Sequence, residues 1–239
     1  MTDLLTTAID AHGGLERWNQ LTSVSARLLQ GGALWTLKGH EGVLDDVVVT
    51  ASLHEERASH RPFGAPDQRT AFRPERVAIE RDDGSTVEKL DRPRDSFAGH
   101  AFDTPWTRLQ LAYFVGTAMW TYLTQPFTFA RAGFETRELG SWDEGGRSVQ
   151  RLQVAWPSDL ATHSKEQTLY FDDDGLVVRH DYEVEIIGRA AAAHYVSDYD
   201  EVAGIKIPTK HRIFPRGPDG QAMTEPLIVS IDLSEMAFT

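Results

Sequence analysis

PWTRLQLAYFVGTAMWTYL, residues 105–123, is the apolar segment that decides the fold, because it separates two groups of β-strand patterns. At helical spacing, one stripe contains Trp106, Leu109, Tyr113, Gly116, Trp120 and Leu123. A second stripe contains Arg108, Leu111, Ala112, Val115, Met119 and Tyr122. A helix that is apolar on two faces is buried in a protein core or in a membrane. Its uninterrupted run, Leu111–Trp120, is about half of the roughly 20 residues that a membrane span needs. We therefore expect a soluble helix enclosed by strands, with no membrane span.

Strand patterns dominate the rest of the chain. Before the helix we expect strands over Val24–Trp35, Asp46–Glu55, Gln68–Phe72, Glu75–Glu80 and Thr86–Leu90. After it we expect them over Phe134–Leu139, Val149–Trp156, Gln167–Phe171, Val177–Ile187, Ala192–Asp198, Ile205–Phe214 and Leu227–Met236. Asp-Gly pairs at Gly84 and Gly175 mark the best hairpin turns. Consecutive hairpins predict an antiparallel meander rather than a parallel α/β fold.

The connecting segments complete the predicted organisation. The first ten residues after Thr2 form a short amphipathic helix, Asp3–His12, capped by Thr2 or Asp3 and ended by Gly13-Gly14. For the central helix, Asp103 or Thr104 is the expected cap, with Pro105 in the first helical position. The stretches Arg61–Pro74 and Asp91–Pro105 are expected to be loops over an opening. No linker or internal repeat divides the chain, so we predict a single domain over residues 1–239.

Composition narrows the classes of function. The 239 residues carry a formal charge of −12, which argues against a nucleic-acid partner, because phosphate binding needs a basic face. There is no cysteine, no histidine spacing typical of a metal site and no glycine-rich phosphate loop. We therefore expect neither a metal nor another cofactor. The N-terminal sequence lacks the pattern of a signal peptide, so we expect a cytoplasmic protein if Met1 is the native start.

Two predicted strands, Val177–Ile187 and Ile205–Phe214, each carry a histidine on the face that also carries their aliphatic residues. His180 and Tyr182 alternate with Arg179 and Asp181, and His211 lies between aliphatic residues of its strand. Imidazole titrates near neutrality, so His180 and His211 are candidate acid–base catalysts, with His100 at the entry to the central helix as a third. A core histidine held by a hydrogen bond is the alternative interpretation. His163 falls in a loop before a strand and is interpreted as structural.

Four residues besides Tyr182 are candidates for ligand binding. Trp106, Tyr113 and Trp120 would line a ligand space along one edge of the aromatic stripe, although core packing explains the same pattern. Arg61 could pair with a carboxylate of a ligand, or it could be a solvated loop residue.

The order of these elements resembles the LolA/LolB lipoprotein-carrier superfamily. The resemblance rests on AHGGLERW near the N-terminus, on YFDDDGLVVRHDY and on YDEVAGIKIPTKHRIFP, and it is strongest over Leu169–Pro215. It implies an α+β, mainly β fold: a curved, antiparallel, incomplete β-barrel of about eleven strands, with an N-terminal helix and a central plug helix over a hydrophobic cavity. The carriers are exported, whereas this sequence shows no signal peptide and no lipid-attachment cysteine.

The leading hypothesis is therefore a half-barrel that binds a hydrophobic small molecule or lipid in its interior. The alternative is a cofactor-independent enzyme that uses the inward histidines for acid–base chemistry on such a molecule. A partner-binding scaffold with an exposed apolar patch and no pocket is a third possibility.

Overall fold

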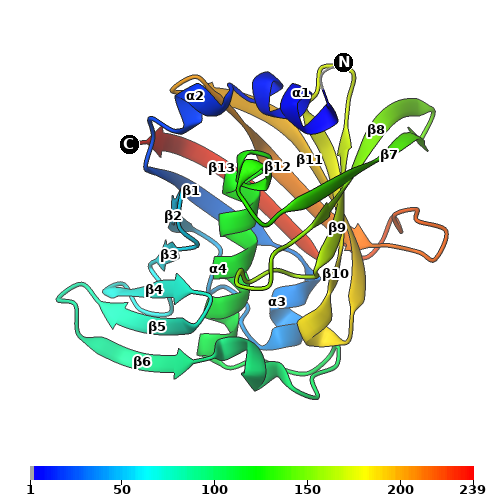
Figure 1. The fold of residues 1–239 in the computed structure, drawn as a ribbon. Coiled ribbons are helices and arrows are strands. Elements are labelled where there is room, and N and C mark those ends of the chain that lie inside the picture. The colour runs from blue at the N-terminus through cyan, green and yellow to red at the C-terminus, as the bar shows by residue number, and fades with distance from the viewer. Residues whose placement is uncertain (1–2) are drawn as a thin grey trace.

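The structure, a computed structural model, describes residues 3–239 and is dominated by one antiparallel sheet (Figure 1). Thirteen strands follow the order β6-β5-β4-β3-β2-β1-β13-β12-β11-β10-β9-β8-β7. Six precede the central helix: β1 (Ser23–Gly31), β2 (Val47–Ser52), β3 (Ala58–Arg61), β4 (Gln68–Arg73), β5 (Arg76–Arg81) and β6 (Thr86–Asp91). Seven follow it: β7 (Glu135–Glu144), β8 (Arg147–Ala155), β9 (Glu166–Phe171), β10 (Val177–Val184), β11 (Ala190–Val202), β12 (Ile205–Pro215) and β13 (Val229–Phe238).

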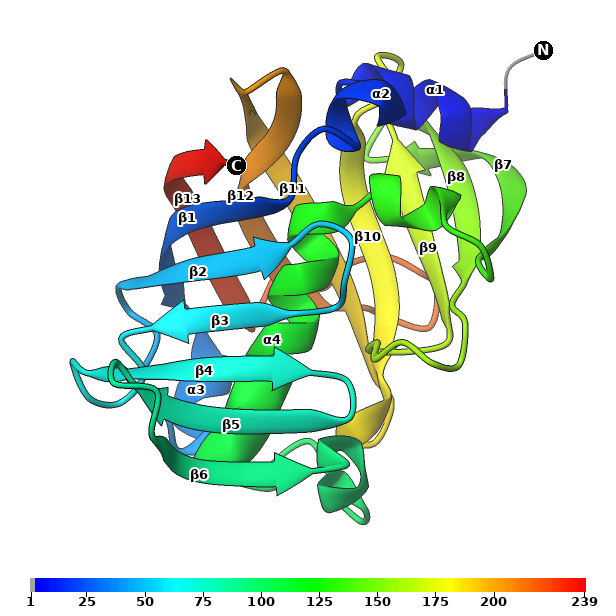
Figure 2. The same cartoon turned by 60° about the vertical axis from the view of Figure 1, so that its left-hand side comes forward.

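The sheet curves around the central helix without closing, as predicted for an incomplete barrel (Figure 2). The helices are α1 (Leu4–Ala11), α2 (Leu15–Trp18), α3 (Ala33–Lys38) and α4 (Arg108–Thr124). Three 3-10 turns, η1 (Pro93–Phe97), η2 (Phe127–Ala130) and η3 (Glu185–Ile187), complete the elements. Asp3 caps α1 by accepting a hydrogen bond from the Thr6 N–H at 2.9 Å. None of the helices within residues 3–239 is long and apolar enough to cross a membrane.

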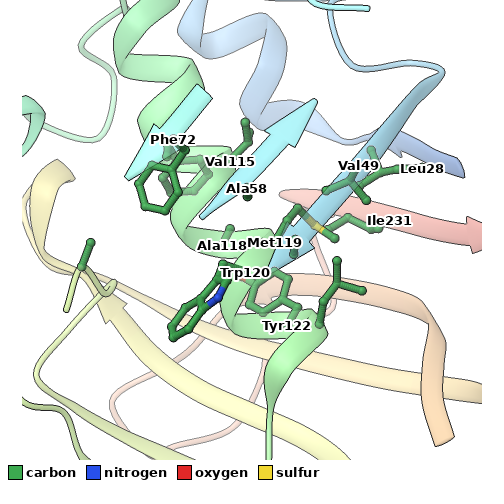
Figure 3. Packing of buried hydrophobic residues seen from close by; sticks show 14 of the residues in the cluster. Leu28, Val49, Ala58, Phe72, Val115, Ala118, Met119, Trp120, Tyr122 and Ile231 are labelled. Atoms are coloured by element: carbon green, nitrogen blue, oxygen red, sulfur yellow. The ribbon is translucent and has the colours of Figure 1, made fainter. Parts of the chain in front are cut away.

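The central helix α4 is buried on all sides, as its two apolar stripes predict. Every residue from Gln110 to Thr124 is buried. One side of α4 packs on β2–β5, where Gly116 contacts Phe72 and the Trp120 indole donates to the Ser52 carbonyl at 2.9 Å. Met119 lies between the helix and the strands that carry Val49 and Ile231 (Figure 3). The helix therefore fills most of the space that a curved sheet leaves open.

The start of α4 differs from the prediction. Thr107, not Asp103 or Thr104, caps the helix, and Pro105 precedes it. The Gln110 N–H donates to Thr107 Oγ1 at 3.2 Å, and the Thr107 N–H donates to Gln110 Oε1 at 2.9 Å. This reciprocal capping box satisfies two backbone donors at once, which a single side-chain cap cannot do.

Two differences in the first half of the sheet have a clear physical cause. The expected strand Val24–Trp35 ends at Gly31, because Gly32 adopts a φ of 107° and the chain turns into α3. A side chain at Gly32 would lie 2.4 Å from the Ile228 carbonyl oxygen, so only glycine fits there. Strand β3 forms where no strand was predicted, pairing with β2 through Val49 opposite His60.

The second half contains a buried polar cluster on the convex face of the sheet. Arg179 is fully buried and binds both oxygens of Asp181, at 2.7 and 2.8 Å. It also lies 2.7 Å from Glu144 Oε2. The expected strand Val177–Ile187 ends at Val184 and is followed by η3. The alternation along the strand correctly predicted that Arg179 lies on the face opposite His180. At this position other side chains cover that face, so Arg179 is buried rather than solvated.

Candidate ligand-binding cavity

A cavity of about 400 Å³ lies between α4 and the strands β10–β13, with α3 and Phe102 beside it. Its lining is almost entirely apolar, and its size falls in the range of small-molecule sites. Exposed residues such as Phe102 and Pro226 mark where it meets the surface. The residues that define its interior are Leu34, Trp35, Phe114, Val115, Ala118, Tyr122, Tyr182, Val184, Ala192, Ile213, Val229 and Ile231.

Small side chains create this space. Ala118 faces it from α4, and Ala190 and Ala192 face it from the start of β11, opposite Val184 and Tyr182 of β10. A helix and a sheet whose facing positions are alanines cannot fill the gap between them, whereas Phe72 fills the corresponding gap on the other side of α4. The cavity therefore lies on the side of α4 that faces β10–β13.

The cavity wall contains few polar groups. The hydroxyls of Tyr122 and Tyr182 are 2.6 Å apart and form a hydrogen bond with each other. Arg216 is also at the wall, but its guanidinium lies toward the convex face, where Nε is 3.5 Å from Asp181 Oδ2. Gln30, from β1, is 7 % exposed, and its Oε1 has no hydrogen-bond partner.

A layer of buried histidines lies behind Tyr122. His180 and His194 are opposite each other on β10 and β11, and His194 Nε2 is 2.9 Å from His211 Nδ1 of β12. The Tyr122 ring is 4.4 Å from the His194 ring and stacks on His211 at 5.6 Å between centroids. His180 Nε2 is 2.7 Å from Gln167 Oε1, which fixes its orientation. Three side chains from neighbouring strands therefore form one compact imidazole layer.

These imidazoles are neutral near pH 7. Burial lowers the pKa of His180 to about 3 and that of His211 to about 4, and it lowers the pKa of His194 as well. Burial also raises the pKa of the Tyr122 and Tyr182 hydroxyls, which stay protonated. Among residues 3–239, no group of three histidine, aspartate or glutamate side chains has the arrangement needed to hold a metal ion. The layer is therefore uncharged, with one hydrogen bond between His194 and His211 and another from His180 to Gln167.

The structure brings some of the predicted catalytic residues together. His180 and His211 belong to the same histidine layer, joined through His194, and Tyr122 separates His211 from the cavity. His100 lies elsewhere, in the turn after η1, with its ring 5.4 Å from that of Phe97. No histidine within the described chain lines the cavity.

Of the predicted ligand-binding residues, Tyr182 alone lines the cavity. Tyr113 and Trp120 lie on the side of α4 that packs on β2–β5, with the Tyr113 ring 5.8 Å from Phe72. Trp106 precedes the helix and packs behind Phe114, at 4.8 Å between ring centroids. The face of α4 that lines the cavity instead carries Phe114, Val115, Ala118 and Tyr122, of which Val115 and Tyr122 belong to the second predicted stripe.

Arg61 is on the surface rather than at the cavity. It ends β3 and forms a two-pronged ion pair with Asp82, with distances of 2.9 and 2.5 Å. About half of each side chain is exposed. The Arg61 guanidinium, which was expected to bind a carboxylate of a ligand, is thus already paired with Asp82.

Several residues at the site were not predicted. His194 follows the inward alternation of Ala192 and Val196, so the strand pattern contained a signal for it. His163 was expected in a loop without a special role, yet its ring stacks on Tyr182 at 4.7 Å. Gln30 had no local signal, because its position depends on how β1 pairs with the last strand.

Several solved structures share this architecture. No protein-family model matches the chain, and no curated protein matches its sequence. A DUF1329 family protein from Desulfovibrio piger aligns with a TM-score of 0.57 and 11% identity, covering 99% of this chain and 94% of that one. A LolA superfamily protein from Nitrosomonas europaea has a TM-score of 0.52 and 9% identity, over 97% and 90%. A putative outer membrane lipoprotein-sorting protein domain from Vibrio parahaemolyticus has a TM-score of 0.52 and 9% identity, over 98% and 91%. The chain thus has the LolA-like fold, and the likeness concerns the fold alone.

Proposed function

We propose that this protein binds a hydrophobic small molecule or a lipid in the cavity between α4 and β10–β13. The observation that carries the proposal is the cavity itself, about 400 Å³ of space walled by aliphatic and aromatic side chains. Removal of apolar surface from water contributes roughly 25 cal/mol per Å², so such a space favours an apolar occupant over water. One protein with the same fold is described as a lipoprotein-sorting domain, which supports an apolar ligand.

The geometry favours binding over acid–base catalysis. A molecule in the cavity meets Tyr122 and Tyr182 first, and the imidazoles of His180 and His211 lie outside the lining. A general base must lie within hydrogen-bond reach of the proton it removes. Imidazoles whose pKa burial lowers to about 3 or 4 are also weak bases at neutral pH.

The test is displacement of a fluorescent apolar dye, together with native mass spectrometry of gently purified protein. We expect the dye to bind and apolar molecules to compete with it. Ala118→Leu adds three carbon atoms inside the cavity and should weaken dye binding by about tenfold or more. Ala237→Leu makes the same change at an exposed position of β13 and serves as the matched control.

Two results would contradict the proposal. One is a folded protein that binds neither the dye nor any extractable apolar molecule. The other is equal dye affinity of the Ala118→Leu variant, the Ala237→Leu variant and the unmodified protein, since binding would then take place outside the cavity.

A further inference from the structure

A groove of about 570 Å³ opens on the outer face of β1–β5, away from α4. Its lining contains four arginines and a single acidic residue, Glu80, which pairs with Arg69 at 3.2 Å. The three other arginines are Arg57, Arg73 and Arg76. In a chain with a formal charge of −12, this groove is a local concentration of positive charge.

The strand register places these three arginines side by side in one row. Arg73 of β4 is directly opposite Arg76 of β5. Ala58 of β3 is opposite Phe72 of β4, and both are buried on the inner face. One position further along each strand, Arg57 therefore lies beside Arg73 on the outer face. In Figure 2 these strands lie in front of α4, so the row is on the side of the sheet that faces away from the helix.

Among the described residues, only the ends of this row have a carboxylate nearby. Arg57 Nε is 3.0 Å from Glu55 Oε2. Arg76 Nε is 3.9 Å from Asp91 Oδ1. Arg73, in the middle, forms no ion pair with any residue from 3 to 239. Like charges directly opposite each other in a sheet are destabilising, so the row contains a repulsion that a bound anion would relieve.

Short side chains form the floor of the groove beside the arginine row. Thr50 is opposite Ser59 on β2 and β3, and Ala71 is opposite Ala78 on β4 and β5. All four residues belong to the lining. Their small size leaves space next to the guanidinium groups, and the two hydroxyls can donate to an oxygen of a bound group.

We infer that this groove binds a phosphate group, in the doubly charged form of a monoester, through Arg57, Arg73 and Arg76. Guanidinium groups are always charged, and their planar fork of donors matches phosphate oxygens. A phosphate monoester carries about two negative charges above pH 7 and has three acceptor oxygens, so it can bind more than one guanidinium. A carboxylate has less charge and fewer acceptors. The groove shares no lining residue with the apolar cavity, so this site is additional to the proposed function.

Isothermal titration calorimetry with glycerol 3-phosphate, at pH 8 and low salt, tests this site. The probe is too polar to enter the apolar cavity, and acetate is the comparison anion. We expect glycerol 3-phosphate to bind about tenfold more tightly than acetate. Arg73→Gln should weaken phosphate binding about tenfold, as the loss of a charge-assisted hydrogen bond allows. Arg137→Gln is the matched control, because it removes the same charge from the exposed strand β7 at the opposite edge of the sheet and should leave binding unchanged.

Co-sedimentation with phosphatidylcholine vesicles, with and without phosphatidic acid, distinguishes the sources of the phosphate group. Binding of glycerol 3-phosphate supports a soluble monoester, and binding of the phosphatidic acid vesicles alone supports a lipid headgroup, provided that Arg73→Gln weakens it. The inference is overturned if neither probe binds, if acetate binds as well as glycerol 3-phosphate, or if Arg73→Gln and Arg137→Gln bind the phosphate probe equally.

Urea unfolding without phosphate gives an independent check on the repulsion within the row. Arg73→Gln should leave the midpoint unchanged or raise it, because it removes the middle one of three like charges. A clear fall of the midpoint would mean that the protein itself already compensates Arg73, and it would also overturn the inference. None of these outcomes depends on whether the apolar cavity binds a ligand.

Discussion

Replacing Gly116 by alanine tests the close packing of α4 against β4. In an unconstrained helix interior, glycine to alanine stabilises by about 0.8–1 kcal/mol. Here the new Cβ would lie 2.3 Å from Phe72 Cγ and 2.6 Å from Phe72 Cβ. These atoms are near the backbone of a strand and cannot swing aside, so the helix or the strand must shift. Overpacking of this kind costs about 1–3 kcal/mol, which exceeds the helix-propensity gain, so we expect a net loss of up to about 2 kcal/mol in the free energy of unfolding.

Urea unfolding followed by tryptophan fluorescence measures this loss. Phe72→Ala provides the control background, because it removes the ring that the alanine would meet. In that background, Gly116→Ala should stabilise by about 0.5–1 kcal/mol, so the sign of the effect reverses. A stabilising effect of Gly116→Ala in the otherwise unchanged protein would refute the reasoning, since it would mean that helix and strand have room between them.

Three further predictions concern buried charges and titrating groups. Arg179→Ala should lower the free energy of unfolding by about 3–5 kcal/mol, because Glu144 loses its cation and Asp181 keeps only Arg216 at 3.5 Å. Arg61→Ala at the exposed pair should lower it by under about 1 kcal/mol, and equal losses in urea unfolding would contradict this. The pKa of His180 is about 3 in the folded state against 6.5 unfolded, so protonation favours unfolding, and stability should fall as the pH drops from 6.5 toward 4. His180→Gln should reduce that fall in thermal melts. Burial raises the pKa of Glu56 to about 8, so the folded state is destabilised increasingly as the pH rises from 4.5 to 8 and the unfolded state ionises this carboxyl. Glu56→Gln should therefore raise the melting midpoint at pH 8 and change it little at pH 5. Equal shifts at the two pH values would disprove this.

The fold could be predicted largely from patterns that act locally. The two stripes of the central helix and the Asp-Gly turns at Gly84 and Gly175 specify a helix and hairpins that each form from neighbouring residues. The capping box at Thr107 was also visible as Thr-x-x-Gln, but Asp103 and Pro105 offered a competing start. The end of β1 was not predictable, because Gly32 is required by Ile228, almost two hundred residues away.

The site was predicted only in part, because some of its features depend on contacts between residues far apart in the sequence. Alternation along single strands placed His180, Tyr182 and His211 on an inner face, and the structure confirms that they are buried there. Which side of the helix keeps an unfilled space depends on the volumes of Phe72 and Ala118, which face different strands. The position of Gln30 depends on the pairing of β1 with β13, and no local pattern carries that information.

The pairing of β1 with β13 also determines when the cavity can form. Strands β1–β6 and β7–β13 are two meanders in which each strand pairs with its neighbour along the chain, and these pairings close short loops. The pairing of Leu28 with Leu233 instead closes a loop that includes most of the chain, and this closure is the most costly in chain entropy. The cavity wall draws Gln30 from one meander and Ile231 from the other. A molecule bound in this cavity would therefore contact both meanders and would stabilise the longest-range strand pairing of the fold.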